Sequence, residues 1–224
     1  YSSHLQAGFF CINKQLPKIG AAYKITAEVF ILNRVDNFNP GPATLPLEVL
    51  QEAQAEFLNF NNSGMSIIEI SHRSKPYAEV HAQTKADILE LMNLGDDYEV
   101  LFIQGGASLQ FAMIPMNFAS TDHKGSYILS GTFSTNAYKE AVTLGVGEIA
   151  ASSKETGFHH VPQQDELKID PNAAYLHICN NNTIYGTEFH YIPETNGIPL
   201  IADMSSDMLS RPYDFSKFDF IYAG

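Results

Sequence analysis

The stretch SYILSGTFSTNAYKEAVTLGVGEIAA, residues 126–151, indicates the fold class of the chain. It opens and closes on short apolar runs, at 126–130 and 146–151, that read as strands. Residues 134–144 between them are long enough for a crossover helix. A strand, a helix and a strand in this order are typical of a mostly parallel sheet, so we predict an α/β fold.

The same alternation continues on both sides of this unit. Further apolar runs lie at 99–103, 174–179, 199–204 and 218–223. Runs that are apolar throughout fit strands buried on both faces of a sheet. A crossover helix is expected over 108–118, shortened or bent by Pro115. Two more helices are expected upstream, one starting at Pro46 and one over 76–92.

Composition limits the class of partner. The chain has 224 residues, 45% of them apolar, and a formal net charge of −12, which argues against nucleic acid or an anionic membrane as the main partner. With neither a membrane-length apolar run nor a signal peptide in the sequence, we expect a soluble, cytoplasmic protein. Cys11 and Cys179 are expected to be free thiols, with no metal site.

In an open α/β sheet, ligands bind beyond the carboxyl ends of the strands, so the residues after each run are the candidates. After 99–103 comes QGGASLQF, where Ala107 and Ser108 open a helix. Free amides at a helix start and the Ser108 hydroxyl suit a phosphate, and a monophosphate fits this glycine pattern better than a nucleotide. The alternative is an ordinary turn with Ser108 as N-cap.

Two further loops carry candidate ligand contacts. Phe133 follows the run at 126–130, just before a helix that Ser134 could cap, and its ring is either a stacking wall or part of the core. Thr183 lies in the asparagine-rich loop NNNTIYG, which suits either ligand contact or a turn stabilised by asparagine side chains.

Asp203 closes the run at 199–204, so burial of its carboxylate is expected and a partner is needed. The options are metal ligation with Asp207, helix capping, or pairing with a protonated ring nitrogen; metal is the weakest, because no histidine clusters nearby. Arg73, one of three arginines, offers a planar fork for a substrate carboxylate. The histidines are assigned no role, except a possible supporting one for His72.

Five ordered motifs over roughly 190 residues resemble the phosphoserine aminotransferases, within the class-V group of pyridoxal-phosphate enzymes. They are NFNPGPATLP, SGMSIIEISHRSK, FIQGGASLQFAMIPMN, CNNNTIYGTEF and ADMSSDMLSRPYDFSKFDFIYAG. The resemblance implies a three-layer large domain of the aspartate-aminotransferase type in a homodimer. It also implies transfer of an amino group from L-glutamate to 3-phosphohydroxypyruvate, which gives O-phospho-L-serine and 2-oxoglutarate.

Carried over position by position, the resemblance gives cofactor roles to five residues. Ala107 and Ser108 would hold the phosphate, and Phe133 would stack on the pyridine ring where many relatives have tryptophan. Thr183 would contact the ring oxygen, and Asp203 would pair with the ring nitrogen. Arg73 would bind a substrate carboxylate.

The resemblance covers 36–224, so we expect an N-terminal extension over 1–35, of unknown role, ahead of a large domain. The Schiff-base lysine is expected just after Gly224, and the chain is expected to be an inactive piece of an active parent. The alternatives are another class-V aminotransferase, a cysteine desulfurase, or a fragment that binds cofactor or phosphate without catalysis. Arg73 in GMSIIEISHR disfavours the other class-V enzymes.

Overall fold

The computed structural model describes residues 34–224 of the chain. The chain divides into two compact units, Tyr1–Asp36 and Asn37–Gly224, and the fold is that of the second. The N-terminal extension expected over 1–35 lies almost entirely outside the described residues.

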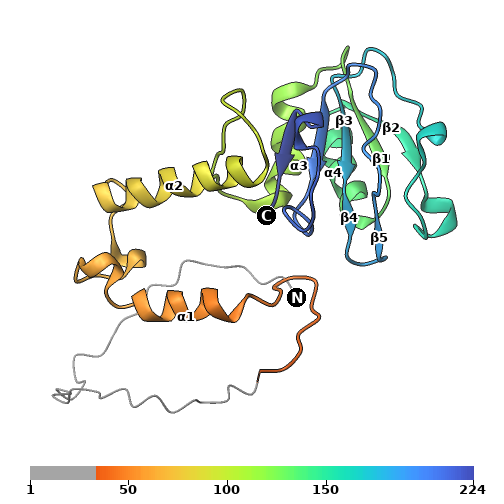
Figure 1. Ribbon diagram of the computed structural model, residues 1–224. Helices are drawn as coiled ribbons and strands as arrows, with labels where there is room; N and C mark the ends of the chain where they lie inside the picture. The colour runs from red at the N-terminus through yellow and green to blue at the C-terminus, as the bar shows by residue number, and fades with distance from the viewer. Residues whose placement is uncertain (1–33) are drawn as a thin grey trace. The chain divides into compact units, whose positions relative to one another are not determined.

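A parallel five-stranded sheet forms the centre of the second unit (Figure 1). Its strands, in spatial order, are β2 (Gly147–Ser152), β1 (Gly125–Leu129), β3 (Tyr175–Cys179), β6 (Leu200–Asp203) and β7 (Phe220–Tyr222). All four pairings are parallel, and every residue of β1, β3 and β6 is buried. This confirms the prediction of a mostly parallel sheet with strands buried on both faces.

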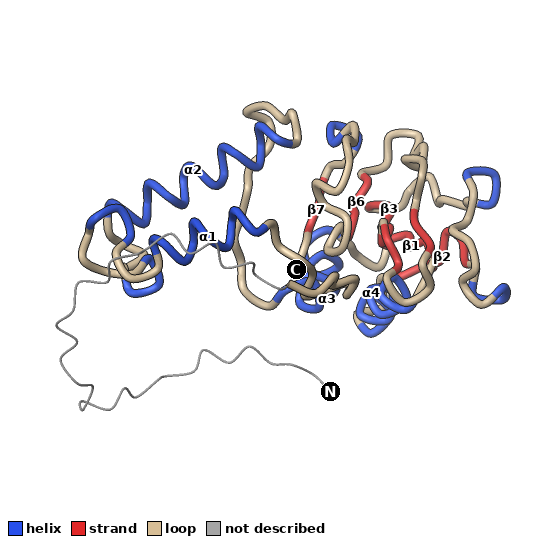
Figure 2. The backbone as a smooth tube through the Cα atoms, turned by 60° about the horizontal axis from the view of Figure 1, so that its bottom comes forward, coloured by secondary structure: helices blue, strands red, loops and turns tan. Residues whose placement is uncertain are grey.

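Two helices cover one face of this sheet, as Figure 2 shows: α3 (Gly106–Phe118) and α4 (Thr132–Thr143). Phe111 and Ile114 of α3 and two alanines of α4 pack against strand residues in one apolar cluster. The helix α3 continues past Pro115 to Phe118, so the expected shortening at this proline was wrong, whereas the alternative of a bend stays a prediction. Because proline has no backbone N–H group, the helix lacks one hydrogen bond at Pro115. The buried contacts of Ile114 and Pro115 outweigh this loss.

The other face is covered by connections and by the end of α2 (Lys75–Leu91). Met92, Phe189, Phe215 and Phe218 are buried there against the central strands. Short 3₁₀ helices and one hairpin complete the described elements. They are η1 (Phe60–Asn62), η2 (Ile67–Glu69), η3 (Lys154–Thr156), η4 (Gln164–Glu166), η5 (Phe215–Lys217), β4 (Asn181–Asn182) and β5 (Thr187–Glu188). The sheet is therefore the middle of three layers.

The segment before α3 differs from the prediction. The helices α1 (Leu47–Glu56) and α2 form as expected, but the run at 99–103 forms no strand. Leu101, Phe102 and Ile103 are each more than half exposed. A strand needs a partner for its ladder, and no described strand pairs with this run, so its apolar composition alone gave the wrong assignment.

A row of buried polar rings, which we call the tyrosine–histidine row, crosses the sheet beneath α3 and α4. The hydroxyl groups of Tyr127 and Tyr175 lie 2.6 Å apart, and His177 Nε2 lies 2.8 Å from the Tyr222 hydroxyl. Burial lowers the pKa of His177 from 6.5 to about 3 and raises the pKa of Tyr175 to about 12. These four side chains are therefore neutral at physiological pH.

No described helix is both long and apolar enough to span a bilayer.

Candidate cofactor site

A cavity of about 640 Å³ opens at the carboxyl ends of β3 and β6. It is lined by residues from separate parts of the chain: Pro40–Pro42, the start of α3, the first turn of α4, the ends of β3 and β6, the β4–β5 hairpin, and Gly224. This is the edge at which a parallel α/β sheet binds ligands.

The start of α3 provides a set of free amides to this cavity. Gly105 is the N-cap with a φ of 96°, and Gly106 has a φ of 56°, so both residues use left-handed backbone that favours glycine. The first intrahelical bond runs from the Leu109 amide to the Gly105 carbonyl at 3.2 Å. The amides of Gly106, Ala107 and Ser108 precede it and have no intrahelical acceptor. The alternative reading of Ser108 as the N-cap was wrong, because the glycines start the helix earlier.

Phe133 lies in the first turn of α4 and lines the cavity with 40% of its surface exposed. The helix begins at Thr132, before the expected cap Ser134. The Ser134 hydroxyl oxygen accepts the amide hydrogens of Ser130 and Gly131, each at 3.0 Å, and so still fixes the turn. Phe133 therefore presents an aromatic surface from a rigid helix start.

Thr183 lies in the tight turn of the β4–β5 hairpin. The Gly186 amide closes this turn on the Asn182 carbonyl at 2.8 Å. The Asn182 side chain donates to the Thr187 hydroxyl at 3.1 Å, so an asparagine side chain stabilises this turn, and Thr183 lines the cavity.

Asp203 is the last residue of β6, and only 4% of its surface is exposed. Its Oδ1 accepts the Ser205 hydroxyl at 2.6 Å and the Ser205 amide at 3.0 Å. Its Oδ2 has a single donor among the described residues, the weak thiol of Cys179 at 3.9 Å. Burial raises the pKa of Asp203, and so does the nearby Asp207 carboxylate, whereas the bonds from Ser205 and Cys179 lower it.

Asp207 lies behind Asp203 in a buried network. Its Oδ2 accepts the Asn180 amide group at 2.5 Å and the Tyr213 hydroxyl at 2.8 Å. Among the described residues, no group of three or more His, Cys, Asp or Glu side chains is arranged to hold a metal ion. Asp203 caps no helix either, because a turn follows it. Pairing of Asp203 with a ring nitrogen stays a prediction.

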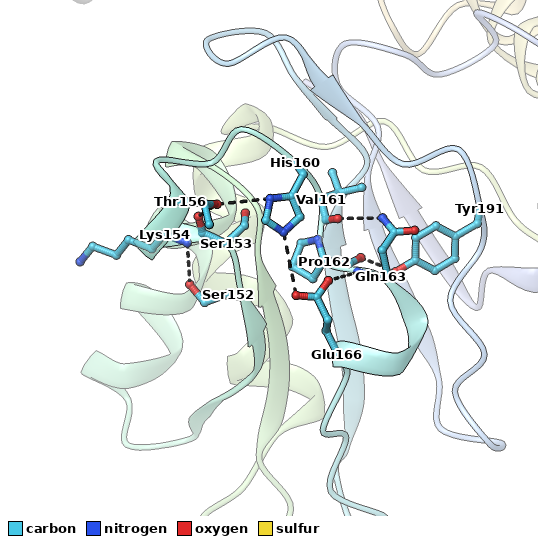
Figure 3. Close-up of polar contacts among 10 residues, drawn as sticks. All are labelled: Ser152, Ser153, Lys154, Thr156, His160, Val161, Pro162, Gln163, Glu166 and Tyr191. Atoms are coloured by element: carbon cyan, nitrogen blue, oxygen red, sulfur yellow. Dashed lines mark hydrogen bonds and ion pairs between the residues drawn. The ribbon is translucent and has the colours of Figure 1, made fainter.

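A second polar cluster follows β2 and lies outside the cavity lining (Figure 3). His160 Nδ1 lies 3.2 Å from the Thr156 hydroxyl, and His160 Nε2 lies 3.9 Å from Glu166 Oε1. This order of groups resembles a nucleophile with its base. However, the Thr156 hydroxyl donates to the Ser153 carbonyl at 2.8 Å, and Glu166 Oε2 accepts the Gln163 amide at 2.7 Å. The cluster therefore ties two loops together.

Five of the six candidate site residues line the one cavity: Ala107, Ser108, Phe133, Thr183 and Asp203. The sixth, Arg73, lies exposed in the turn before α2 and is absent from that lining. The sequence interpretation missed Cys179, Ser205 and Gly224, which also line the cavity. Cys179 ends a predicted apolar run and Gly224 directly follows another, so their positions carried a signal that their residue types did not.

Comparison with protein-family models matches residues 35–224 to the class-V aminotransferases. The chain belongs to this family. The chain is 53% identical over 192 residues to phosphoserine aminotransferase of Desulfosudis oleivorans, covering 85% of this chain and 53% of the relative. It thus spans about half the length of the curated relatives it matches.

Solved structures give the same relationship. Phosphoserine aminotransferase from Bacillus circulans subsp. alkalophilus superposes with a TM-score of 0.82 at 49% identity, over 85% of this chain and 53% of that one. The pyridoxal-phosphate-bound enzyme from Trichomonas vaginalis gives a TM-score of 0.78 at 41% identity, over 85% of this chain and 57% of that one.

The cavity fits pyridoxal phosphate in size and chemistry. Its volume of about 640 Å³ lies in the range of small-molecule sites. The free amides at the start of α3 suit a phosphate, and the weakly bonded Oδ2 of buried Asp203 suits a protonated ring nitrogen. None of the lysines in the described part of the chain lines the cavity.

Proposed function

We propose that the chain carries the cofactor site of a phosphoserine aminotransferase of L-serine biosynthesis. The whole protein would transfer the amino group of L-glutamate to 3-phosphohydroxypyruvate and release O-phospho-L-serine and 2-oxoglutarate. The supporting observation is that five residues from separated stretches of sequence line one cavity at the carboxyl end of a parallel sheet. The similarity to enzymes named phosphoserine aminotransferase supports the choice of substrate.

The start of α3 holds the phosphate in this proposal. The amides of Gly106, Ala107 and Ser108 point out of the helix start and carry the positive end of the helix dipole. The Ser108 hydroxyl adds a neutral donor. A dianionic phosphate would replace water on these amides and so fix one end of the cofactor.

Asp203 and Phe133 hold the ring. The carboxylate of Asp203 would keep a proton on the ring nitrogen, because a nearby opposite charge favours the charged form of both partners. Phe133 would pack on one ring face, and the Thr183 hydroxyl would donate to the ring oxygen. When bound, the cofactor supplies the electron sink for amino transfer.

The substrate side of the proposal rests on Arg73. Its guanidinium would hold a substrate carboxylate bidentately, although it lies outside the lining of the cavity. A lysine just after Gly224 as the covalent anchor, a homodimer and a cytoplasmic location stay predictions of the same proposal.

Binding of pyridoxamine 5′-phosphate tests the cofactor site, because this amine form needs no lysine. We expect the chain to bind it, and Asp203→Asn to weaken binding about 100-fold, the effect of removing one partner of a buried charge pair. Asp170→Asn, an exposed aspartate ahead of β3, is the control. Calorimetric titration gives the affinities, and equal affinities for the two variants would remove the role of Asp203.

The substrate is tested on the protein that contains this chain. Its rates with 3-phosphohydroxypyruvate, pyruvate and glyoxylate as amino acceptors should differ, with the phosphorylated acceptor preferred. Arg73→Lys should raise KM more than it lowers kcat, because lysine keeps the charge and loses the planar fork. A preference for pyruvate or glyoxylate would point to another class-V activity.

A further inference from the structure

Ser205 links three elements of the cavity through one hydroxyl group. It follows β6 by two residues and donates to Asp203 Oδ1 at 2.6 Å. The same oxygen accepts the amide hydrogen of Gly224, after β7, at 3.1 Å. A buried carboxylate and the backbone at the end of the neighbouring strand therefore share one hydroxyl.

We propose that Ser205 is a positioning residue for the cofactor, which orients the Asp203 carboxylate and fixes the end of β7 at the cavity. By occupying Oδ1, Ser205 leaves Oδ2 as the oxygen available to the ring nitrogen. This inference rests on the proposed function for the identity of the ligand, whereas the hydrogen bonds stand without it.

The bond to Gly224 extends this role to the phosphate end of the site. A Cβ atom at Gly224 would overlap the backbone nitrogen of Ala107, so the two backbones are in direct contact. The Ala107 amide is one of the free donors at the start of α3. Ser205 thus connects the carboxylate for the ring nitrogen with the backbone that packs on the phosphate-binding turn.

The neighbouring Ser206 makes a natural comparison. Both serines are exposed and both follow β6. The Ser206 hydroxyl instead accepts the Asn181 side-chain amide at 2.9 Å and lies near the Asn181 carbonyl. Replacing either serine by alanine removes the same atom, but only Ser205 contacts Asp203.

The other groups that face Asp203 cannot replace this donor. They are the Cys179 thiol on β3, the Asp207 carboxylate in the turn after β6, and the Tyr222 hydroxyl on β7. Asp207 opposes a negative charge on Asp203, and the thiol is a weak donor. Loss of the Ser205 hydroxyl should therefore raise the pKa of Asp203 further, so that the carboxyl takes up its proton at higher pH.

Carbon-13 NMR of the chain without ligand tests the inference directly. The Asp203 carboxyl signal is assigned with Asp203→Asn and titrated in Ser205→Ala, Ser205→Thr and Ser206→Ala. We expect the midpoint to move to higher pH in Ser205→Ala and to stay at the wild-type value in Ser205→Thr and Ser206→Ala. Ser205→Cys, nearly equal in volume with a weaker donor, should move it in the same direction and serves if the alanine variant fails to fold.

The pH dependence of pyridoxamine 5′-phosphate binding gives the consequence for the ligand. In Ser205→Ala we expect the acid limit of binding at higher pH, and an affinity at pH 7 about tenfold weaker, the effect of one hydrogen bond to a charged group. A shifted NMR midpoint in a chain that binds no ligand would leave the orientation of Asp203 by Ser205 intact and remove the proposed cofactor site. Equal midpoints in Ser205→Ala and Ser206→Ala would overturn the inference whatever the affinity.

Discussion

The tyrosine–histidine row and the strand-end group of Cys179, Asp203 and Ser205 lie on, or just after, strands of the same sheet, and burial acts on both. In the row, polar atoms bond to one another beneath α3 and α4, and burial keeps every group neutral. In the strand-end group, Asp203 lines a cavity and keeps an oxygen with only a thiol donor. The tyrosine hydroxyl groups and His177 Nε2 in mid-strand are paired within the chain, whereas a carboxylate oxygen at the strand end can be left for a ligand.

The largest expected effect is a loss of folding stability at acid pH, and it arises from His177 in the tyrosine–histidine row. Because the pKa of His177 is about 3 in the folded chain and near 6.5 when unfolded, the unfolded chain binds the extra proton between these values. The contribution of neutral His177 to the free energy of unfolding is therefore fully present above pH 6.5. Below that pH it falls by about 1.4 kcal/mol per pH unit. At pH 4.5 the loss should be about 3 kcal/mol.

His177→Gln should remove this part of the pH dependence, whatever its effect at neutral pH. Urea unfolding at pH 8, 6 and 4.5 measures it, with exposed His159→Gln as the control that keeps the wild-type slope. If the slopes of the two variants agree, His177 is not buried as a neutral ring, and the contrast between row and strand end weakens.

The next effect, about 2 kcal/mol, comes from the hydroxyl of Tyr222. Tyr222→Phe keeps the ring between Phe111 and the sheet but leaves His177 Nε2 buried without a partner. His177 Nδ1 already lacks a partner among the described residues, so the whole imidazole would be unsatisfied. The free energy of unfolding at pH 8 should fall accordingly.

Tyr185→Phe is the matched change outside the core. Its hydroxyl lies 3.3 Å from the Thr132 hydroxyl in an exposed pair, and its loss should cost less than about 0.5 kcal/mol. A similar cost for both tyrosines would mean that the row is open to water.

The two regions also differ in how far the sequence predicts them. The runs at 126–130 and 199–204 became β1 and β6 within one residue at most of their ends, because apolar patterning is local. The run at 99–103 has the same patterning and forms no strand, because pairing depends on a partner distant in sequence.

The site residues also divide into those that local sequence predicts and those that depend on contacts between distant parts of the chain. Asp203 was predictable, since a charged residue that closes an apolar run must be buried and partnered. Ser205 was not, because its role depends on the order β3–β6–β7, which brings Gly224 beside it. The tyrosine–histidine row was hidden for the same reason, as its members lie on three strands whose register the sequence does not reveal.

The smallest expected effect, about 1 kcal/mol, is on the binding of pyridoxamine 5′-phosphate. It would distinguish an aromatic ring that faces the ligand from one that is only exposed to solvent. Phe133→Ala should weaken pyridoxamine 5′-phosphate binding about fivefold, because a stacked ring adds about this much beyond its buried area. Phe133→Trp should bind at least as tightly, since indole offers a larger face. Phe118→Ala is the control, because Phe118 is also exposed but ends α3 against Phe220, away from the cavity lining.

Calorimetric titration of the three variants shows whether an exposed ring beside the strand ends contributes to ligand binding while an exposed ring elsewhere does not. The alternative is that the 40% exposure of Phe133 reflects only a surface position on α4. In that case Phe133→Ala and Phe118→Ala would bind alike, and only Asp203 and the start of α3 would distinguish the cavity from ordinary surface. A fivefold loss confined to Phe133 would add the ring face to the ligand-facing group.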